Sequence, residues 1–574
     1  MKRLARYLKG YTKECILGPL FKLLEATLEL FVPFVVAAMI DNGVETGNIP
    51  YLVKAMLILV LLGAVGLLFS VTAQFFAAKA SVGFTTRLRH ALFHKVGTLS
   101  YSDLDRMGTS SLITRMTTDC NTVQSGTNLI LRLALRSPFV VFGAMVMAFT
   151  IDVPSALTFV VAIPALSIVV FGIMLISIPL YKKVQKKLDS VLFATRENIG
   201  GARVIRAFGR EDEEIADFRE KNDALTAAQK FVGGISNLLN PLTYTMINAA
   251  TFFLIYQGAV RVDHGILTQG QVVALYNYMG MILVELIKLA SLIISIAKAL
   301  ASADRIAAVL DTEPSMENGD QPFTIKGEEI LSFDNVSLRY HESGEDSLSS
   351  ITFSVKRGET VGIIGGTGSG KSSLVNLIPR FYDATGGKIL LYGEDIRSYD
   401  TESLRAHIGV VPQKAVLFKG TLRDNMKWGK ADATDEEIAY AVETAQATGV
   451  VRDKGGLDAM IEAGGRNLSG GQRQRLTIAR ALVKKPDILI LDDSASALDF
   501  ATDAALRRAL RENTGDSTVF IVSQRASSLL FADKIIVLDD GEAVAIGSHD
   551  ELLTTCPLYR EIYETQFQKG GEAE

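Results

Sequence analysis

The sequence predicts two domains of different class: an all-α, six-helix polytopic membrane domain, followed by an α/β domain with a phosphate-binding loop. Long apolar runs are confined to residues 15–300, whereas residues 325–565 have the composition of an ordinary α/β domain. Within the second part, a complete glycine-rich motif lies between an apolar strand and a helix. We place the membrane domain at 1–310, a polar linker at 311–325 and the α/β domain at 326–574.

The composition narrows the class of protein further. A chain of 574 residues is too long for one core, so at least two domains are expected. The net charge of −4 has no basic excess, so no nucleic-acid partner is expected. The mean hydropathy of +0.25 is high for a soluble protein. Cys15, Cys120 and Cys556 are scattered and form no metal-binding pattern, so we interpret them as reduced thiols.

Six apolar segments of about 20 residues are each long enough to cross roughly 30 Å of hydrocarbon. They lie near 16–40, 52–75, 129–150, 154–180, 235–260 and 272–298. The joins 41–51, 150–154 and 261–270 are short and hold little positive charge, whereas the N-terminus and the joins 76–128 and 181–234 are rich in Lys and Arg. Because positive charge favours the cytoplasmic side, we expect a multi-pass protein of the cell membrane with both termini and the α/β domain in the cytoplasm.

The two long joins are helical in pattern and contain no proline. We expect each to form a helical hairpin that extends roughly 35–40 Å from the bilayer at about 1.5 Å per residue. The hairpin tips are predicted near Thr109–Met116 and Arg203–Gly209, where they could dock on the α/β domain. The alternative is that both hairpins are simply solvated.

Several charged residues fall inside the predicted spans. Glu25 and Glu29 lie one turn apart in the first span, and Glu285 and Lys288 lie one turn apart in the last. Since charge is costly in hydrocarbon, these side chains should face the bundle interior, a partner or water. One interpretation is a polar patch in a substrate cavity, with Glu29 and Glu285 as the first candidates. The other is structural pairing between helices, and Glu285 can also pair with Lys288 at this spacing.

The phosphate-binding motif comprises Gly365, Gly366, Thr367, Gly368, Ser369, Gly370, Lys371 and Ser372, and Ser373 follows it. Glycines allow successive backbone N–H groups to point at phosphate oxygens, and the helix N-terminus that follows favours negative charge. Lys371 can reach the β- and γ-phosphates, and the Ser372 hydroxyl is placed to bind Mg²⁺. The motif therefore predicts a nucleoside triphosphate site.

Four further features surround this motif. Tyr340 follows a predicted strand and could stack on an adenine ring. Gln413 and Asp492 each follow an apolar strand and can bind Mg²⁺ through oxygen, and Gln413 could instead orient water. A second phosphate-binding helix N-terminus is formed by Leu468, Ser469, Gly470, Gly471 and Gln472. One domain cannot wrap both glycine motifs around one nucleotide, so the second motif should serve a nucleotide held by another subunit.

These motifs, in this order after six spans, resemble the half-transporters of ATP-binding cassette (ABC) exporters over the whole chain. The resemblance implies a P-loop NTPase cassette, ATP and Mg²⁺ as ligands, and two halves that hold two ATP molecules between their cassettes. It assigns Tyr340 to adenine stacking, Gln413 to the Q-loop, Leu468–Gln472 to the signature, Asp492 to the Walker B carboxylate and Ser496–Asp499 to the D-loop.

Two positions depart from the family pattern. The family has a catalytic Glu where this chain has Asp493, and a switch His where it has Gln524. Aspartate is one methylene shorter than glutamate, so its carboxylate lies roughly 1.5 Å further from the reacting phosphate. Misplacing a catalytic group by about 1 Å can lower the rate by on the order of 10²-fold. With Asp493, Gln524 and Gln413 as its catalytic candidates, the site is expected to bind ATP but hydrolyse it slowly. The alternative is that Asp493 is an adequate base.

Because the signature is intact, we expect this chain to complete a competent ATP site in a second, non-identical half-transporter. The pattern resembles the degenerate-site subunit of bacterial heterodimeric multidrug exporters. The leading hypothesis is ATP-driven export of amphipathic, drug-like or lipid-like small molecules across the cell membrane, with hydrolysis mainly at the partner's site. The alternatives are a regulatory subunit that binds ATP without transporting, and an importer built on the exporter fold.

Overall fold

The computed structural model describes residues 2–325, 327–340, 344–494 and 496–568, so the ends of the predicted α/β domain lie outside the described residues. The chain divides into two compact units. The helical unit contains residues 1–97 and 109–312, and the α/β unit contains residues 98–108 and 313–574.

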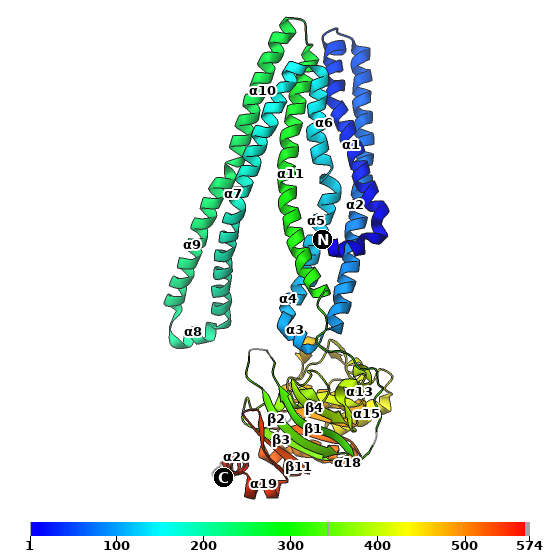
Figure 1. Ribbon diagram of the computed structural model, residues 1–574, viewed down its shortest axis with the longest axis vertical. Helices are drawn as coiled ribbons and strands as arrows, with labels where there is room; N and C mark the ends of the chain where they lie inside the picture. The colour runs from blue at the N-terminus through cyan, green and yellow to red at the C-terminus, as the bar shows by residue number, and fades with distance from the viewer. Residues whose placement is uncertain (1, 326, 341–343, 495, 569–574) are drawn as a thin grey trace. The chain divides into compact units, whose positions relative to one another are not determined.

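The helical unit consists of long helices with few breaks (Figure 1). After a 3-10 segment at Lys2–Tyr11, they are α1 (Thr12–Met39), α2 (Ile49–Thr98), α4 (Thr109–Thr114), α5 (Cys120–Leu133), α6 (Arg136–Ile151), α7 (Val153–Gly200), α8 (Ala202–Phe208), α9 (Glu211–Asn237), α10 (Leu239–Asp263) and α11 (Gln269–Leu310). Single π-helical turns at Ile40–Val44 and Arg115–Asp119 extend α1 and join α4 to α5.

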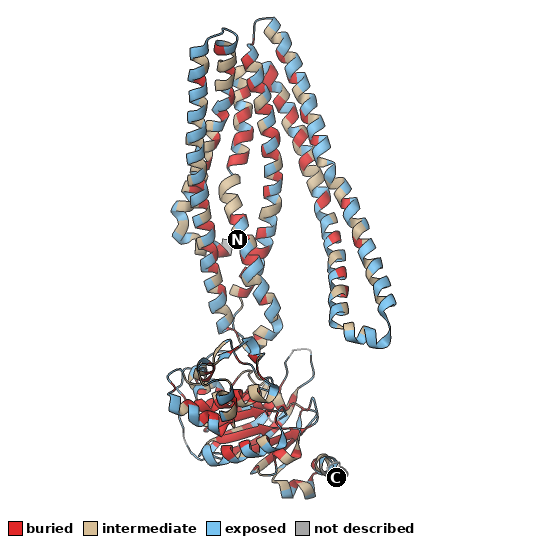
Figure 2. Ribbon diagram, turned by 180° about the vertical axis from the view of Figure 1, so that it is seen from behind, coloured by how far each residue is buried: buried red, intermediate tan, exposed pale blue. Residues whose placement is uncertain are grey.

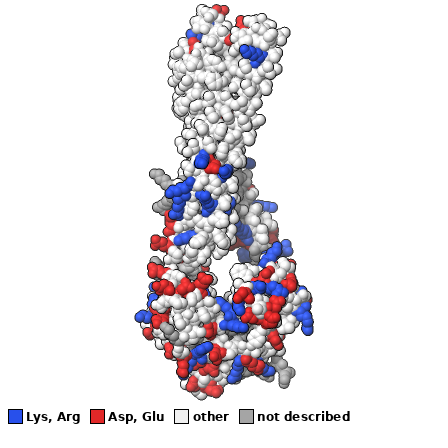
Figure 3. All heavy atoms as spheres, turned by 90° about the vertical axis from the view of Figure 1, so that its right-hand side faces the viewer, with Lys and Arg blue, Asp and Glu red and all other residues white. Residues whose placement is uncertain are grey.

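Six helical stretches in the described residues are long and apolar enough to cross a membrane, which confirms the predicted six-span domain. They run over Leu4–Val44, Ile49–Thr98, Thr109–Ile151, Val153–Gly200, Glu211–Asp263 and Gln269–Leu310. Helices suit this setting because they satisfy every backbone N–H and C=O group within the segment. On the face drawn in Figure 3, the upper part of the helical unit is almost free of charged side chains, as hydrocarbon contact requires.

The core of the helical unit lies where α1, α6, α10 and α11 face one another, and exposed residues cover the outer helix faces (Figure 2). Small side chains such as Ala26 and Ala144 are fully buried there and let the helices approach closely. The buried Tyr278 hydroxyl donates a hydrogen bond to the Leu30 carbonyl at 2.7 Å, which ties α11 to α1. Helices α7 and α9 run side by side in Figure 1 and share their own small apolar cluster, which includes Val191 and Leu225.

The first helical hairpin has a different tip from the predicted one. Its tip is α3 (Tyr101–Met107), which belongs to the α/β unit, whereas Thr109–Met116 lies in the helical unit. Docking by Thr109–Met116 stays a prediction. Ser100 caps α3 through a reciprocal capping box with Asp103, and Gly108 ends the helix at φ 73°. The second tip, α8, covers nearly the whole predicted segment Arg203–Gly209.

The α/β unit contains a six-stranded, mostly parallel sheet in the order β12-β11-β3-β10-β9-β6 and a four-stranded antiparallel sheet in the order β2-β1-β4-β5. The strands are β1 (Glu329–Leu338), β2 (Leu348–Lys356), β3 (Thr360–Gly365), β4 (Gly386–Leu391), β5 (Glu394–Asp395), β6 (Ile408–Val411), β9 (Ile488–Asp492), β10 (Thr518–Val522), β11 (Lys534–Asp539) and β12 (Glu542–Gly547), with β7 (Gly420–Thr421) and β8 (Met460–Ile461) forming a separate pair.

The helices of this unit flank the sheets (Figure 1). They are α12 (Lys371–Leu377), α13 (Thr401–Ala406), α14 (Leu422–Lys427), α15 (Asp435–Thr444), α16 (Thr448–Asp453), α17 (Gly470–Val483), α18 (Phe500–Asn513), α19 (His549–Thr555) and α20 (Pro557–Gln568). Strands β3, β10, β9 and β6 are adjacent and parallel, so their carboxyl ends meet at one edge of the sheet. In α/β sheets that edge is where ligands bind. The six spanning helices and this α/β unit together confirm the predicted helical membrane domain followed by an α/β cassette.

Candidate functional site

A pocket of about 420 Å³ lies at the carboxyl ends of the parallel strands. Its lining residues come from six separate segments of the sequence. Its lining includes Thr367, Gly368, Gly370, Lys371, Ser372 and Ser373 from the glycine motif, together with Gln413, Asp492, Asp493, Ser523 and Gln524. The fold therefore brings together most of the residues that the sequence assigned to the nucleotide site, although they span more than 150 positions in the chain.

The glycine motif needs its small residues for two physical reasons. A Cβ on Gly365 would lie 2.1 Å from the Leu538 carbonyl oxygen, so only glycine fits against β11. Gly370 has φ 91°, a left-handed conformation that favours glycine. The Lys371 ammonium donates to the carbonyls of Gly365 at 3.0 Å and Gly366 at 2.5 Å, so it lies across the loop that would hold phosphates. Burial lowers the pKa of Lys371.

Two adjacent carboxylates face this lysine. Asp492 is 8% exposed and accepts a hydrogen bond from the Ser372 hydroxyl at 3.1 Å. Burial raises the pKa of Asp492, and the neighbouring Asp493 charge adds to the shift. Burial also raises the pKa of Asp493, although Gln413 and Lys371 oppose it. Because a bound cation favours the ionised form of two adjacent, partly buried acids, the pocket is electrostatically suited to a metal ion.

The backbone of Asp493 is held in an unusual conformation. Its φ is +45°, in the left-handed region that few non-glycine residues other than Asn and Asp adopt. Its N–H donates to the Val522 carbonyl at 3.1 Å, and its own carbonyl accepts from the Ser496 hydroxyl at 2.9 Å. The Gln524 carbonyl accepts a hydrogen bond from the Gln566 side chain at 2.8 Å. Both departures from the family pattern therefore lie in the pocket, on a well-tethered backbone.

Tyr340 lies at the margin of this site and is not among the described lining residues of the pocket. Its hydroxyl donates to the Ser373 hydroxyl at 3.0 Å, which ties it to α12, the helix that follows the glycine motif. Burial raises the pKa of Tyr340. The Tyr382 ring meets the Tyr340 ring edge-on at 4.9 Å, a contact that sequence reasoning missed.

The second glycine motif is placed elsewhere. Ser469 caps α17 through a capping box, in which the Gln472 N–H donates to the Ser469 hydroxyl at 3.3 Å. Ser469 and Gly470 are exposed, while Leu468 is buried beneath them. The described lining of the nucleotide pocket contains none of the residues Leu468–Gln472. This helix N-terminus is therefore open to a ligand or subunit from outside.

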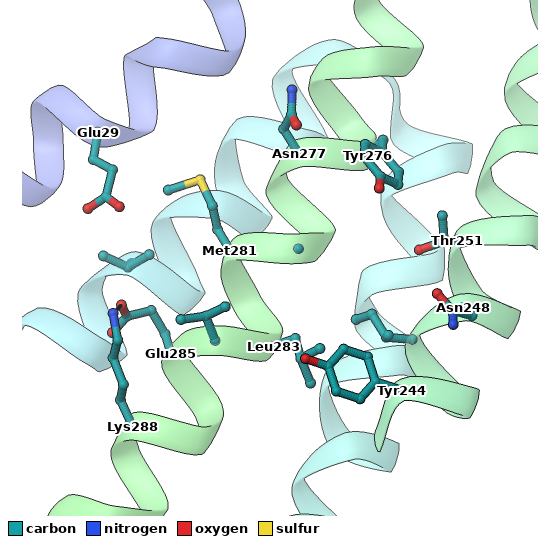
Figure 4. A pocket seen from close by; sticks show the side chains of 14 residues that line it. Glu29, Tyr244, Asn248, Thr251, Tyr276, Asn277, Met281, Leu283, Glu285 and Lys288 are labelled. Carbon is teal, nitrogen blue, oxygen red and sulfur yellow. Dashed lines mark hydrogen bonds and ion pairs between the residues drawn. The ribbon is translucent and has the colours of Figure 1, made fainter. Parts of the chain in front are cut away.

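A separate pocket of about 460 Å³ lies in the helical unit between α1, α6, α10 and α11. Both acids predicted for a substrate cavity, Glu29 and Glu285, line it. Figure 4 shows Glu29 on α1 at one side and α11 across the middle. Tyr276 and Asn277 lie on α11, and Tyr244, Asn248 and Thr251 lie on α10 on the far side from Glu29. The walls combine aromatic, aliphatic and uncharged polar groups with a small number of charges.

The sequence analysis missed Arg136, which joins the two acids. Its guanidinium contacts Glu285 and Glu29, each at 2.5 Å, although 149 and 107 positions separate these acids from it in sequence. The Arg136 side chain is 7% exposed and that of Glu285 is 4% exposed, whereas that of Glu29 is 45% exposed. Glu285 also accepts from Ser137 at 2.8 Å and from Lys288 at 2.9 Å, which confirms the predicted pair with Lys288.

The two carboxylates therefore have different roles in the helical unit. Glu285 is buried and accepts hydrogen bonds on both oxygens, so it acts as a structural anchor for Arg136. Glu29 accepts from Arg136 through one oxygen and remains partly exposed to the cavity. Structural pairing fits Glu285, which lines the cavity but is 4% exposed, whereas Glu29 is 45% exposed. A role of either acid in binding a substrate stays a prediction.

Comparisons with known proteins identify the family. The profile of the ABC transporter transmembrane region matches residues 15–286, and the ABC transporter profile matches residues 348–496. An uncharacterized ABC transporter ATP-binding protein of Mycobacterium tuberculosis is 34% identical over 570 residues, which cover 98% of this chain and 97% of the relative. The chain belongs to the ABC transporter family. Its six-span domain is fused to an ABC cassette, as in exporter-type half-transporters.

Two further matches place this ABC transporter more closely. A multidrug efflux ATP-binding/permease protein of Mycobacterium tuberculosis is 31% identical over 561 residues, which cover 98% of this chain and 47% of that protein. A solved structure of a bacterial Atm1-family ABC exporter with ATP bound is 25% identical, with a TM-score of 0.79 and 99% of each chain covered. The exporter fold is thus shared over essentially the whole transporter.

An ABC cassette implies ATP binding, typically with Mg²⁺, and the residues of this cassette fit both. Ser372, Gln413 and Asp492 offer a hydroxyl, an amide carbonyl and a carboxylate in one pocket, the hard oxygen ligands that Mg²⁺ prefers. Burial and the neighbouring Asp493 charge raise the pKa of Asp492, and a bound metal ion would favour its ionised form. Lys371 and the N–H groups of the glycine motif provide the complementary charge for phosphates.

Proposed function

We propose that this chain is one half of a heterodimeric ABC exporter that moves amphipathic small molecules out of the cell. In this proposal its own ATP site binds nucleotide but hydrolyses it slowly, and its signature completes the partner's faster site. The observation that carries the proposal is a pocket lined by most of the predicted binding residues together with Asp493 and Gln524, the two departures from the family pattern. Both termini and the cassette would lie in the cytoplasm.

The chain's own residues account for binding. Lys371 and the backbone N–H groups of the glycine motif would neutralise the β- and γ-phosphates, and Tyr340 would stack on the adenine. Ser372, Gln413 and Asp492 would hold Mg²⁺, which when bound offsets charge on the phosphate oxygens. These functions need only groups that the fold already gathers around one pocket.

Slow hydrolysis follows from the two remaining positions. In the family pattern a glutamate orients the attacking water, and the shorter Asp493 would hold its carboxylate roughly 1.5 Å further away. The tethered backbone at Asp493 limits any movement that would restore this reach. Gln524 can donate a hydrogen bond to a phosphate oxygen, but it cannot carry the charge or transfer the proton that a histidine can.

The signature supports a role toward a partner. The exposed Ser469 hydroxyl and the N–H groups at the start of α17 form a site for phosphate that the chain's own pocket does not use. Placed against a partner with a consensus pocket, this end of α17 would offset the charge that develops on the transferring phosphoryl group. A homodimer would instead contain two slow sites.

For cargo, we propose that the 460 Å³ cavity binds amphipathic compounds. Exposed Tyr244 and Tyr276 and the aliphatic wall suit an apolar body, and the partly exposed Glu29 suits a polar or charged end. The name of the multidrug efflux relative agrees with this class of cargo. Docking by α3 and by α8, whose Val204 and Phe208 are exposed, would transmit cassette closure to the spans.

The test is a reconstituted heterodimer with a partner that carries Glu and His at the two catalytic positions, such as the product of a neighbouring reading frame. Asp493→Ala should leave most of the ATPase activity, because hydrolysis occurs mainly in the partner. Ser469→Arg should remove it, because the bulky cation blocks the partner's site. The reverse order of effects would contradict the proposal, and cargo accumulation inside oriented vesicles would distinguish export from import.

A further inference from the structure

We propose that Tyr382 is a positioning residue that connects Tyr340, beside the nucleotide site, to helix α3, so that nucleotide binding alone strengthens the hold of α3 on the cassette. The proposal rests on the nucleotide site described under the proposed function, but it depends on neither a heterodimer nor a slow site. Nothing in the family motifs assigns a role to Tyr382, which lies outside the glycine motif and the signature.

Helix α3 is fastened to the α/β unit near its start. Asp103 is 1% exposed, and its carboxylate accepts a hydrogen bond from the Ser315 N–H at 2.9 Å. The hydroxyls of Ser100 and Ser315 lie 2.6 Å apart. The Tyr101 ring packs against the Phe381 ring with centroids 4.7 Å apart. These contacts hold one end of α3, and none of them involves Tyr340 or a residue of the glycine motif.

Tyr382 supplies a connection that these contacts lack. Its hydroxyl donates to the Asp105 carboxylate of α3 at 2.7 Å, while its ring meets the Tyr340 ring edge-on at 4.9 Å and 88°. Tyr340 in turn donates to Ser373 at 3.0 Å, on the helix that follows the glycine motif. A continuous series of contacts therefore runs from Asp105 through two tyrosines to Ser373.

The chemistry of each group suits such a connection. An edge-on ring pair at 4.9 Å is in full contact, so a shift of Tyr340 must displace Tyr382 or be resisted by it. Burial, together with Asp105, raises the pKa of the Tyr382 hydroxyl, so it stays protonated as a donor to Asp105. An adenine stacked on Tyr340 would restrict the motion of that ring. Because Tyr382 contacts both Tyr340 and Asp105, the motion of Asp105 would be restricted as well.

The test measures amide hydrogen exchange of residues 98–108 in the full-length chain in lipid nanodiscs, with and without saturating Mg²⁺ and a non-hydrolysable ATP analogue. In the wild type the analogue should slow this exchange at least about threefold. Tyr382→Phe keeps the ring contact and loses the hydrogen bond, so analogue affinity should stay within about twofold while the slowing falls below about 1.5-fold. Asp105→Ala should give the same loss, and the double variant no more.

Tyr399→Phe is the matched control. Its buried hydroxyl donates to the Leu391 carbonyl at 2.9 Å in the same unit, and its ring packs against Phe323, away from the Tyr340–Tyr382–Asp105 series of contacts. This variant should keep the full nucleotide-dependent slowing. The proposal is overturned if Tyr382→Phe keeps the slowing, or if Tyr399→Phe loses it equally. A wild type that does not bind the analogue would refute the nucleotide site itself, whereas binding without slowing would refute only the role of Tyr382.

Discussion

Replacing Arg136 with leucine leaves the buried Glu285 carboxylate without its main partner. Breaking a buried ion pair by removing one member costs about 3–5 kcal/mol. Lys288 remains 2.9 Å from Glu285 and is 44% exposed, so we expect the lower end of this range, about 3 kcal/mol. At about 2.1 cal/mol/K of unfolding entropy per residue, 1 kcal/mol shifts the midpoint of a unit of about 300 residues by roughly 1.6 °C. The helical unit should therefore unfold roughly 5 °C lower.

Buried thiols provide the assay. Cys120 is fully buried in the helical unit. Its reaction with a thiol-specific dye reports unfolding of that unit once the half-buried Cys15, and Cys556 of the α/β unit, are replaced by alanine. The Arg136→Leu/Glu285→Gln double variant should recover part of the loss, because no buried charge is left unpaired.

The matched control is Arg210→Leu, which breaks an ion pair with Glu213 that is 2.7 Å long and about two-thirds exposed. Exposed pairs contribute about 0–1 kcal/mol, so this variant should barely move the midpoint. An Arg136→Leu midpoint equal to that of Arg210→Leu, or a double variant less stable than the single, would show that the buried network does not stabilise the bundle as reasoned.

Three further predictions follow from the two pockets. Tyr340→Ala should weaken binding of a fluorescent ATP analogue by about 1–3 kcal/mol, the usual loss of one base–aromatic stack; an unchanged Kd would exclude stacking at this residue. Chelation of Mg²⁺ should weaken ATP binding about tenfold or more in the wild type, and much less in Asp492→Asn, which already lacks the carboxylate. Equal losses of affinity in the two proteins would show that Asp492 does not bind the metal. Glu29→Gln should change the cargo concentration that gives half-maximal stimulation of the ATPase and leave the unfolding midpoint unchanged. Glu285→Gln should lower the unfolding midpoint. The opposite pattern would show that the two acids have the reverse roles.

Most of the architecture could be predicted from local sequence. Six apolar runs of sufficient length leave few alternatives to spanning helices, because backbone N–H and C=O groups in hydrocarbon must be hydrogen-bonded within the segment. The glycine motif, the signature and the strand-ending acids are each contiguous, so their local structure follows from a few neighbouring residues. The gathering of Lys371, Gln413 and Asp492 in one pocket then follows from parallel strands that end at the same edge.

The missed features depend on contacts between distant segments. Arg136 lies in an apolar run, and no local pattern identifies its partners Glu29 and Glu285, because only the packing of α1, α6 and α11 brings them together. The misplaced hairpin tip is a different case. Ser100 and Asp103 form a capping box and Gly108 ends the helix, so the local sequence of α3 contains both a helix start and a helix stop signal. An expectation based on the charge of the join and its lack of proline does not detect these signals.

The slow site can be tested without any partner. We would measure steady-state ATP hydrolysis by the purified wild-type chain in lipid nanodiscs and by the Asp493→Glu/Gln524→His variant, which restores the family pattern. We expect slow turnover by the wild type and an increase on the order of 10²-fold in the variant, with ATP affinity unchanged. Brisk hydrolysis by the wild type alone that is abolished by Asp493→Ala would contradict the proposal, because Asp493 would then be an adequate base and the chain would need no second kind of subunit.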